Sequence, residues 1–140
     1  MKILLAVDGS AYTQKMLAYL TSHQEMLGTG HEYTIITVQP LLPPRARAAL
    51  GRDVVEQYYD EESTKILQPV QEFLNGRGVQ VQSISKVGPI ADTIIKEAQD
   101  GKFDLIAMGT HGHGALGRLV MGSVSSQVLA GCTIPVLLIR

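Results

Sequence analysis

The residues best suited to chemistry form a glycine-rich segment in the last third of the chain. Residues 108–117 have the sequence MGTHGHGALG, and Gly122 and Ser123 follow shortly after. An apolar run at 103–108 precedes this segment, and a helical pattern that includes Val124 follows it, with Ser123 expected to cap the helix. A strand that ends in a glycine-rich loop before the start of a helix predicts an anion-binding site. Backbone N–H groups face a concavity there, and the positive end of the helix dipole adds to them.

The distribution of charge along the chain agrees with an anionic ligand. All 13 acidic residues lie at or before Asp104, so residues 105–140 contain no carboxylate side chain. The same region contains Arg118, His111 and His113. Two histidines without a third ligand nearby do not indicate a metal site, and we assign no metal ligands from the sequence.

Two common phosphate-binding loops can be compared with this segment. Residues 112–117 match the GxGxxG pattern of dinucleotide-binding proteins, but they follow the fourth predicted strand, and no acidic residue follows to bind a ribose. A P-loop requires Gly-Lys-Ser/Thr, and this segment contains no lysine. Phosphate charge must therefore be met by backbone amides, the hydroxyl of Ser123, Arg118 or a metal ion. This set favours binding over rapid phosphoryl transfer, which normally uses positioned cations.

Composition limits the class of protein. A chain of 140 residues with 45% hydrophobic residues predicts one globular domain, residues 1–140. The net charge of −1 and the absence of tryptophan give no reason to expect nucleic-acid binding. The single cysteine, Cys132, suits a reducing compartment. We expect no membrane insertion and a cytoplasmic location, because no apolar stretch approaches membrane-spanning length and the chain starts without a signal-peptide pattern.

Apolar runs and helical patterns alternate along the whole chain. Short apolar or alternating runs predict strands at 3–7, 33–38, 79–85, 103–108 and 136–139. Helical spacing lies between them, at 12–27, 55–74, 91–98 and 124–129. This order predicts a doubly wound, Rossmann-like α/β domain: a five-stranded parallel sheet flanked by four helices. Ser10 should cap the first of these helices, and Pro69 should kink the second. Pro40, Pro43 and Pro44 should break regular structure in the connection before the second helix. The alternating run at 79–85 suggests a strand at or near an edge.

The predicted fold also indicates where a ligand would bind. Ligands of doubly wound sheets bind beyond the carboxyl ends of the strands, where the strand order reverses. Asp8 follows the first strand, where it either shapes a turn with Gly9 and Ser10 or contacts a ligand, and Gly109 follows the fourth. If these two strands are neighbours, Asp8 and the glycine-rich segment face one crevice.

The chain resembles the universal stress protein family over its whole length. Residues 3–10 (ILLAVDGS) are similar to the first strand and turn of that family, and residues 104–112 (DLIAMGTHG) to its fourth strand. Residues 135–139 (PVLLI) are similar to its last strand. The nucleotide-binding branch of the family has the motif G-x2-G-x9-G-[S/T], which is matched here by Gly109, Gly112, Gly122 and Ser123. The resemblance implies a fold of the adenine nucleotide alpha hydrolase type.

The resemblance also implies a ligand and its contacts. It implies ATP or another adenine nucleotide, AMP or ADP, with Mg²⁺ bound through the phosphates. It places adenine near Ala6 and Val38 and beside Met108, and Asp8 near the ribose or a phosphate-bound metal. The residues assigned to the phosphates are Gly109, Gly112, Gly122, Ser123 and Val124, with Ser125 as a weaker extension.

The resemblance further implies a homodimer through the last strand, whose open apolar edge would suit such pairing. We expect a regulatory or stress-response module whose nucleotide is sensed by a protein partner, with no catalytic residues. The alternative is a slow ATPase or a self-phosphorylating enzyme that uses Ser123 or Thr110 at the same site. A dimer that acts only through protein contacts is a third possibility. The basic connection with Arg45, Arg47 and Arg52 should reach solvent or a neighbouring subunit, or else serve as a gate or an anionic partner site.

Overall fold

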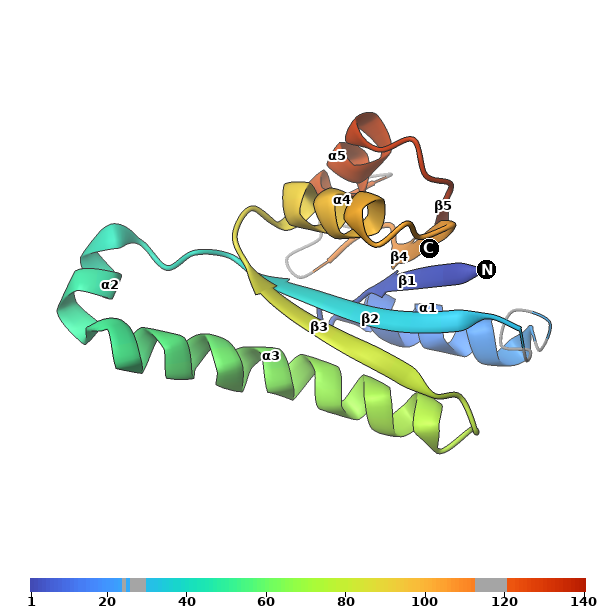
Figure 1. Cartoon of the computed structure of the whole chain (residues 1–140), viewed down its shortest axis with the longest axis horizontal. Coiled ribbons are helices and arrows are strands. Elements are labelled where there is room, and N and C mark those ends of the chain that lie inside the picture. Colours follow the sequence, from blue (N-terminus) through green and yellow to red (C-terminus); the bar gives the residue numbers. More distant parts are fainter. Residues whose placement is uncertain (24, 26–29, 113–120) are drawn as a thin grey trace.

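Five parallel strands form one sheet at the centre of the molecule (Figure 1). The computed structural model describes residues 1–23, 25, 30–112 and 121–140. The strands are β1 (Lys2–Ala6), β2 (Glu32–Gln39), β3 (Val81–Val87), β4 (Leu105–Gly109) and β5 (Val136–Ile139). Their order across the sheet is β3-β2-β1-β4-β5, and every neighbouring pair is parallel. This confirms the predicted doubly wound α/β fold.

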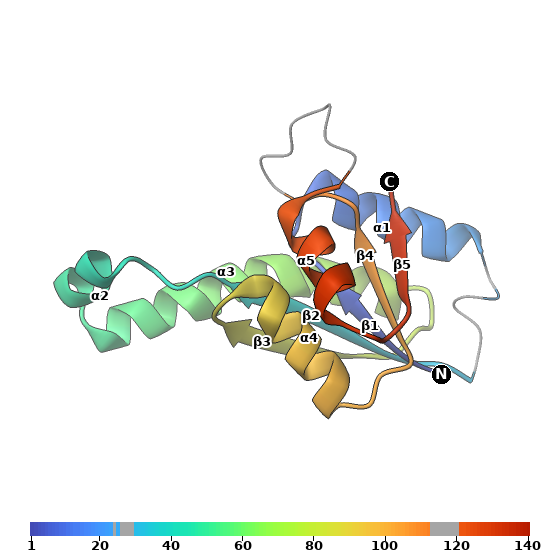
Figure 2. The ribbon, with the colours of Figure 1, turned by 90° about the horizontal axis from the view of Figure 1, so that it is seen from above.

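Helices cover both faces of the sheet. They are α1 (Ala11–Ser22), α2 (Pro44–Leu50), α3 (Arg52–Asn75), α4 (Ile90–Asp100) and α5 (Ser123–Gly131). Figures 1 and 2 show α1 and α3 on one face and α4 and α5 on the other. The sequence predicted four helices, and the described residues contain a fifth, α2. We treated the prolines of this connection as helix breakers, but Pro44 occupies the first helical position, where its missing N–H group is not needed.

Helix ends follow the local sequence. Ser10 caps α1, as predicted, because its Oγ accepts a hydrogen bond from the N–H of Tyr12 at 3.2 Å. The helix ends at Ser22, so it is shorter than the predicted pattern, part of which (24 and 26–29) lies outside the described residues. The long helix α3 continues through Pro69, where we expected a kink.

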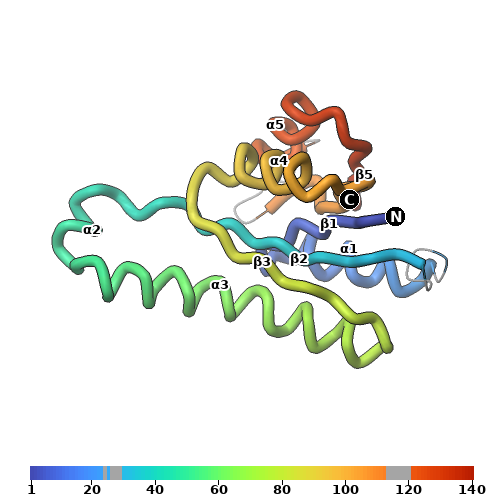
Figure 3. Tube along the Cα trace, viewed as in Figure 1, coloured from blue at the N-terminus to red at the C-terminus, as the bar shows by residue number. Residues whose placement is uncertain are grey.

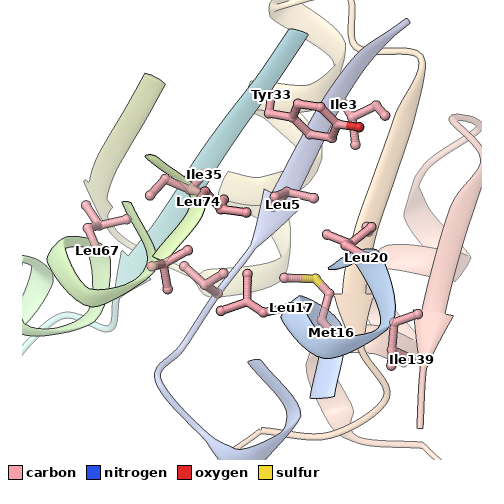
Figure 4. Packing of buried hydrophobic residues seen from close by; sticks show 13 residues of the cluster. Ile3, Leu5, Met16, Leu17, Leu20, Tyr33, Ile35, Leu67, Leu74 and Ile139 are labelled. Carbon is pink, nitrogen blue, oxygen red and sulfur yellow. The ribbon is translucent and has the colours of Figure 1, made fainter. Parts of the chain in front are cut away.

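The core has two halves, one on each side of the sheet. Alternate strand residues point to opposite faces, so Ile3 and Leu5 pack against α1 and α3, whereas Leu4 and Ile106 pack against α4 and α5. Figure 4 shows the first half, in which Met16 and Leu20 of α1 meet the strands. Because both faces are covered, the inner strands are continuous apolar runs, which made them recognisable in the sequence.

The two edges of the sheet differ. β3 lies at one edge, as predicted, and its exposed residues are mostly polar: Gln82, Ser83, Ser85, Lys86 and Val87. β5 lies at the other edge and is wholly apolar. Within the described ranges, no helix combines the length and the apolar character needed to cross a membrane.

One part of the chain projects from the body. The tube in Figure 3 shows α2 and the first turns of α3 extending past the ends of the strands. We call residues 41–59 the arm. A hydrogen bond from the N–H of Leu42 to the hydroxyl of Tyr59, 2.9 Å long, ties the two ends of the arm together.

Candidate functional site

The strand order reverses at the centre of the sheet. β1 pairs with β2 on one side and with β4 on the other. Successive strands are therefore added on one side of β1 up to β3 and on its other side from β4 onwards. A cavity of about 560 Å³ opens beyond the carboxyl ends of these three strands. This volume lies within the roughly 300–1,000 Å³ that is usual for small-molecule sites. The cavity is therefore where the switch-point rule places a ligand.

All ten residues singled out from the sequence line this cavity. They are Ala6, Asp8, Val38, Met108, Gly109, Gly112, Gly122, Ser123, Val124 and Ser125. They come from three strand ends and the start of α5, so the fold brings together residues more than 100 positions apart.

The other lining residues were not predicted to bind the nucleotide, although Thr110 was named as a phosphorylation candidate. They are Val7, Tyr12, Thr13, Ile36, Thr37, Gln39, Pro40, Ile66, Ile90, Ile94, Thr110 and His111. Those at the ends of β1, β2 and β4 could have been found, because they adjoin predicted residues at the same edge of the sheet. Ile66 could not, because it belongs to a predicted helix whose position over the sheet no local pattern reveals.

One wall of the cavity is apolar. Val38 and Met108 lie near the ends of β2 and β4, the two strands that flank β1, and are almost fully buried. Ile90 and Ile94 of α4 line the same wall, together with Ala6. This wall offers contact to a flat apolar group, such as an aromatic ring, without charge.

Another part of the lining is made largely of backbone. The N–H of Gly122 donates to the carbonyl oxygen of Thr110 at 2.6 Å, and the hydroxyl of Ser125 donates to the same oxygen at 2.6 Å. These bonds join the end of β4 to the start of α5. The two glycine segments that the sequence predicted to act together are therefore in contact.

Two of the glycines lie so close to neighbouring side chains that a larger residue would not fit. A Cβ on Gly109 would lie 2.5 Å from Cβ of Tyr12, well inside van der Waals contact. A Cβ on Gly112 would overlap the carboxylate of Asp8. Both positions thus need glycine so that the loop can pass close to the turn after β1.

The start of α5 opens on the cavity. Gly122 is the N-cap residue, and no side chain of the described residues caps the helix. The prediction that Ser123 caps it is therefore wrong: Ser123 is the first helical residue, and its exposed side chain lines the cavity. The first N–H groups of a helix have no partner within the helix, so an uncapped start can donate to a bound anion.

Asp8 holds the turn between β1 and α1 through its side chain. Its Oδ1 accepts hydrogen bonds from the N–H of Ser10 at 2.9 Å and from the hydroxyl of Thr13 at 3.1 Å. These bonds shape the turn between β1 and α1. The carboxylate also approaches Gly112, so it lies between the turn and the glycine loop.

The described lining carries little positive charge. It contains neither lysine nor arginine, and its one imidazole, that of His111, has Nδ1 2.9 Å from the hydroxyl of Thr110. Arg118, His113 and the rest of the predicted GxGxxG match lie outside the described residues. Among the residues that are described, no three His, Cys, Asp or Glu side chains gather in a group that could hold a metal ion.

A parallel sheet with a glycine-lined cavity at its reversal point defines a doubly wound α/β protein of the Rossmann-like class. The model of the Universal stress protein family matches residues 1–140. The chain belongs to the universal stress protein family.

Curated relatives agree with this assignment. The chain is 30% identical over 146 residues to universal stress protein YxiE of Bacillus subtilis, covering 99% of this chain and 98% of that protein. It is also 30% identical over 139 residues to universal stress protein Slr1230 of Synechocystis, but there the match covers 99% of this chain and only 42% of the relative.

Solved structures share the fold. The MJ0577 protein of Methanocaldococcus jannaschii superposes with a TM-score of 0.81 at 25% identity, covering 99% of this chain and 94% of that one. A universal stress protein of Arabidopsis thaliana, solved with AMP bound, gives a TM-score of 0.71 at 16% identity, with 99% and 90% covered. One from Archaeoglobus fulgidus, in complex with dAMP, gives 0.68 at 20% identity, with 100% and 98% covered.

Proposed function

We propose that this protein binds an adenine nucleotide in the cavity and acts as a regulatory module whose state depends on that nucleotide. The observation that carries the proposal is the meeting of Gly109, Gly112 and Gly122 beside the start of α5, in a cavity that also has an apolar wall. An apolar wall suits a base, and the first N–H groups of α5 suit phosphates, whereas the N–H of Gly122 itself already donates to Thr110. Structural neighbours that contain AMP or dAMP support the same ligand class.

The residues divide naturally between the parts of a nucleotide. In this proposal Ala6, Val38 and Met108 contact the adenine ring. The phosphates lie at the backbone of the three glycines and at Ser123 and Val124. The hydroxyl hydrogen of Ser125 is used inside the protein, so its part in binding is at most that of an acceptor or a backbone donor.

A magnesium ion would enter with the phosphates. Asp8 is the single carboxylate among the described lining residues, and it lies beside the glycine loop. One carboxylate with phosphate oxygens is a usual Mg²⁺ environment, whereas a resident metal site needs more protein ligands. We therefore assign Asp8 to the ribose or to an ion that the nucleotide carries.

Calorimetric titration with ATP, ADP and AMP tests the proposal. Ser123→Ala removes a hydroxyl that would donate to a charged phosphate, a bond worth about 1.5–3 kcal/mol. We expect a loss of affinity of roughly ten- to a hundredfold. Ser126→Ala is the matched control, because Ser126 is an exposed serine of the same helix outside the cavity lining.

Two outcomes would contradict this assignment. If no adenine nucleotide binds at millimolar concentration and none raises the melting temperature, the cavity has another ligand, because a molecule that binds only the native state must stabilise it. If a nucleotide binds and Ser123→Ala behaves like Ser126→Ala, Ser123 does not contact the phosphates.

The described lining supports binding more than hydrolysis. Phosphoryl transfer normally relies on cations placed around the transferred group, and the described lining includes no lysine or arginine. Incubation with γ-labelled ATP distinguishes the two functions. Release of phosphate, or transfer of label to Ser123 or Thr110, would favour the enzyme.

We also propose that two copies pair through β5, in a cytoplasmic protein whose nucleotide state a regulatory partner senses. The carbonyls of Pro135 and Ile139 accept hydrogen bonds from β4, so the intervening Val136 and Leu138 direct backbone groups to the open edge. Val136→Pro removes one outward N–H group and keeps the pairing with β4. We expect the variant to lose this dimer in sedimentation velocity; an unchanged mass would exclude β5 pairing.

A further inference from the structure

One cation lies beside the cavity without forming part of its lining. The Nζ atom of Lys15, on α1, is 4.7 Å from the centroid of the Tyr12 ring, and Tyr12 lines the cavity. Among the described residues, no carboxylate forms an ion pair with Lys15. Its positive charge is therefore held by the face of an aromatic ring and is not neutralised by a neighbouring acid.

Tyr12 is fixed close to the glycine loop. A Cβ on Gly109 would lie 2.5 Å from the Cβ of Tyr12, so the backbone at the end of β4 passes directly beside this residue. The rings of Tyr12 and His111 are 5.0 Å apart, which joins α1 to the segment after β4. Lys15 follows Tyr12 by three residues and shares its side of α1. The cation is thus anchored beside the part of the cavity where the glycines meet.

The base and the cation fall on different sides of the sheet. Val38 and Met108, which we assign to the base, belong to the half of the core that α4 and α5 cover. Tyr12 and Lys15 belong to α1, which covers the other face (Figure 2). Gly109 follows Met108 directly and lies against Tyr12, so the glycine loop lies between the two regions. A phosphate chain that starts from the base reaches the glycines first and Lys15 later.

The chemistry of lysine suits the end of such a chain. Its ammonium has three N–H donors and sits on a flexible four-carbon stem, so it acts as a movable point charge. The stem of Lys15 can remain against the Tyr12 ring while the ammonium turns to a phosphate oxygen. Because the described cavity lining contains no lysine or arginine, no cation of that lining meets the charge of the outer phosphates.

We propose that Lys15 sets the preference of the cavity for phosphate number and that Tyr12 positions it. Lys15 donates a hydrogen bond to an outer phosphate oxygen of a nucleoside diphosphate or triphosphate, whereas a monophosphate ends at the glycines and does not reach it. This inference rests on the proposed nucleotide site and adds a specificity-determining residue outside its lining. The protein therefore binds ATP more tightly than AMP.

Calorimetric titration with ATP and with AMP, both in the presence of EDTA so that no Mg²⁺ screens the phosphates, tests the proposal. Lys15→Gln removes the charge from an exposed position and keeps a good helix former. We expect it to weaken ATP binding roughly two- to fivefold, the effect of one exposed charge pair, and to leave AMP binding unchanged. Lys15→Arg keeps the charge and should keep the preference for ATP.

Further comparisons separate a contact with phosphate from a general change of charge. Lys102→Gln removes an exposed lysine that precedes β4, at the opposite end of that strand from the cavity, and should change neither affinity. Added salt should weaken ATP binding less in Lys15→Gln than in the unaltered protein, because the lost interaction joins exposed charges. Tyr12→Phe keeps a ring beside Lys15 and should bind as the unaltered protein does, whereas Tyr12→Leu should lose part of the preference for ATP.

The results distinguish this inference from the function on which it rests. If the unaltered protein binds neither nucleotide, the proposed function is wrong and the role of Lys15 falls with it. If both bind, equal losses for ATP and AMP in Lys15→Gln, or no loss for either, exclude that role and leave the nucleotide cavity in place. AMP that binds the unaltered protein as tightly as ATP would also overturn it. Circular dichroism checks that each variant is folded, and the two Tyr12 variants decide if Lys15→Gln is not.

Discussion

At the scale of single residues, Asp8 shows how one side chain serves both the fold and the cavity. One of its oxygens holds the turn after β1 through Ser10 and Thr13. The same carboxylate lies against Gly112 at the cavity. The sequence suggested either a turn residue or a ligand-binding residue, and the geometry is compatible with both roles at once.

Two substitutions separate these roles. Asp8→Asn keeps an oxygen that accepts from Ser10 and Thr13 but removes the charge, so we expect little change in the free energy of unfolding and weaker binding of Mg²⁺-ATP. Asp8→Ala removes both hydrogen bonds and should cost about 1–3 kcal/mol of stability. Urea unfolding and calorimetry measure the two effects. Equal destabilisation by both variants would show that the charge itself holds the turn.

The lining of the cavity was predictable where residues adjoin strand ends. The position of a glycine-rich loop between a buried strand and a helix indicated the region, and the resemblance to the family motif selected Gly109, Gly112 and Gly122 within it. The capping role given to Ser123 was wrong because a serine and a glycine are both acceptable N-caps, and the sequence alone does not say which one starts the helix. The hydroxyl of Ser125, not that of Ser123, bonds to the carbonyl of Gly122.

At the scale of elements, α1 depends on its cap. The hydroxyl of Ser10 accepts from the N–H of Tyr12, and Ser10 is buried. We expect Ser10→Ala to lower the free energy of unfolding by about 1 kcal/mol, the usual loss for an N-cap serine. Ser22→Ala, at the exposed other end of α1, is the control and should change it much less. Urea titration followed by circular dichroism compares them.

Strand positions were predictable because burial on both faces leaves an unmistakable apolar run. The helix α2 was not, because its prolines resemble those of a loop and its residues bury nothing that would give it a periodic apolar face. The length of α1 was overestimated because an apolar pattern does not always mark where a helix ends. Apolar spacing continued in the sequence past Ser22, where the helix itself stops.

At the scale of the whole molecule, stability should depend on pH through a buried phenol. Tyr33 is 3% exposed, and its hydroxyl has no hydrogen-bond partner among the described residues. Burial raises the pKa of Tyr33 above its usual value, because the charged form is poorly solvated there. The native state thus favours the neutral phenol. This contribution is complete below the pKa of the unfolded chain, about 10, and is lost as the pH rises through the higher pKa of the native state.

Tyr33→Phe tests this dependence. The variant removes an unpaired buried hydroxyl, so we expect it to be as stable as the unaltered protein or about 1 kcal/mol more stable at neutral pH. Above about pH 10 its stability should fall less steeply than that of the unaltered protein. Tyr19→Phe, a partly exposed position, controls for the general effect of alkali. A parallel decline of Tyr33→Phe and the unaltered protein would exclude Tyr33 as the group responsible.

The overall architecture followed from the order of elements. Alternation of strands and helices restricts the chain to parallel strands with right-handed connections, which leaves few arrangements. Because the last two strands return to the other side of the first, β1 and β4 become neighbours and the cavity appears between them. The projection of the arm could not be predicted from the sequence, because it depends on how far α3 extends past the sheet and not on a local pattern.

The unlike edges of the sheet set a limit on how the chain can aggregate. A protein with two adhesive edges could add copies at both ends without limit and grow into a fibre. Here the β3 edge is polar and includes a lysine, a feature that discourages strand addition, while the β5 edge is apolar. A sheet that two copies join at their β5 edges would end in two β3 edges, whose polar residues discourage the addition of a third copy.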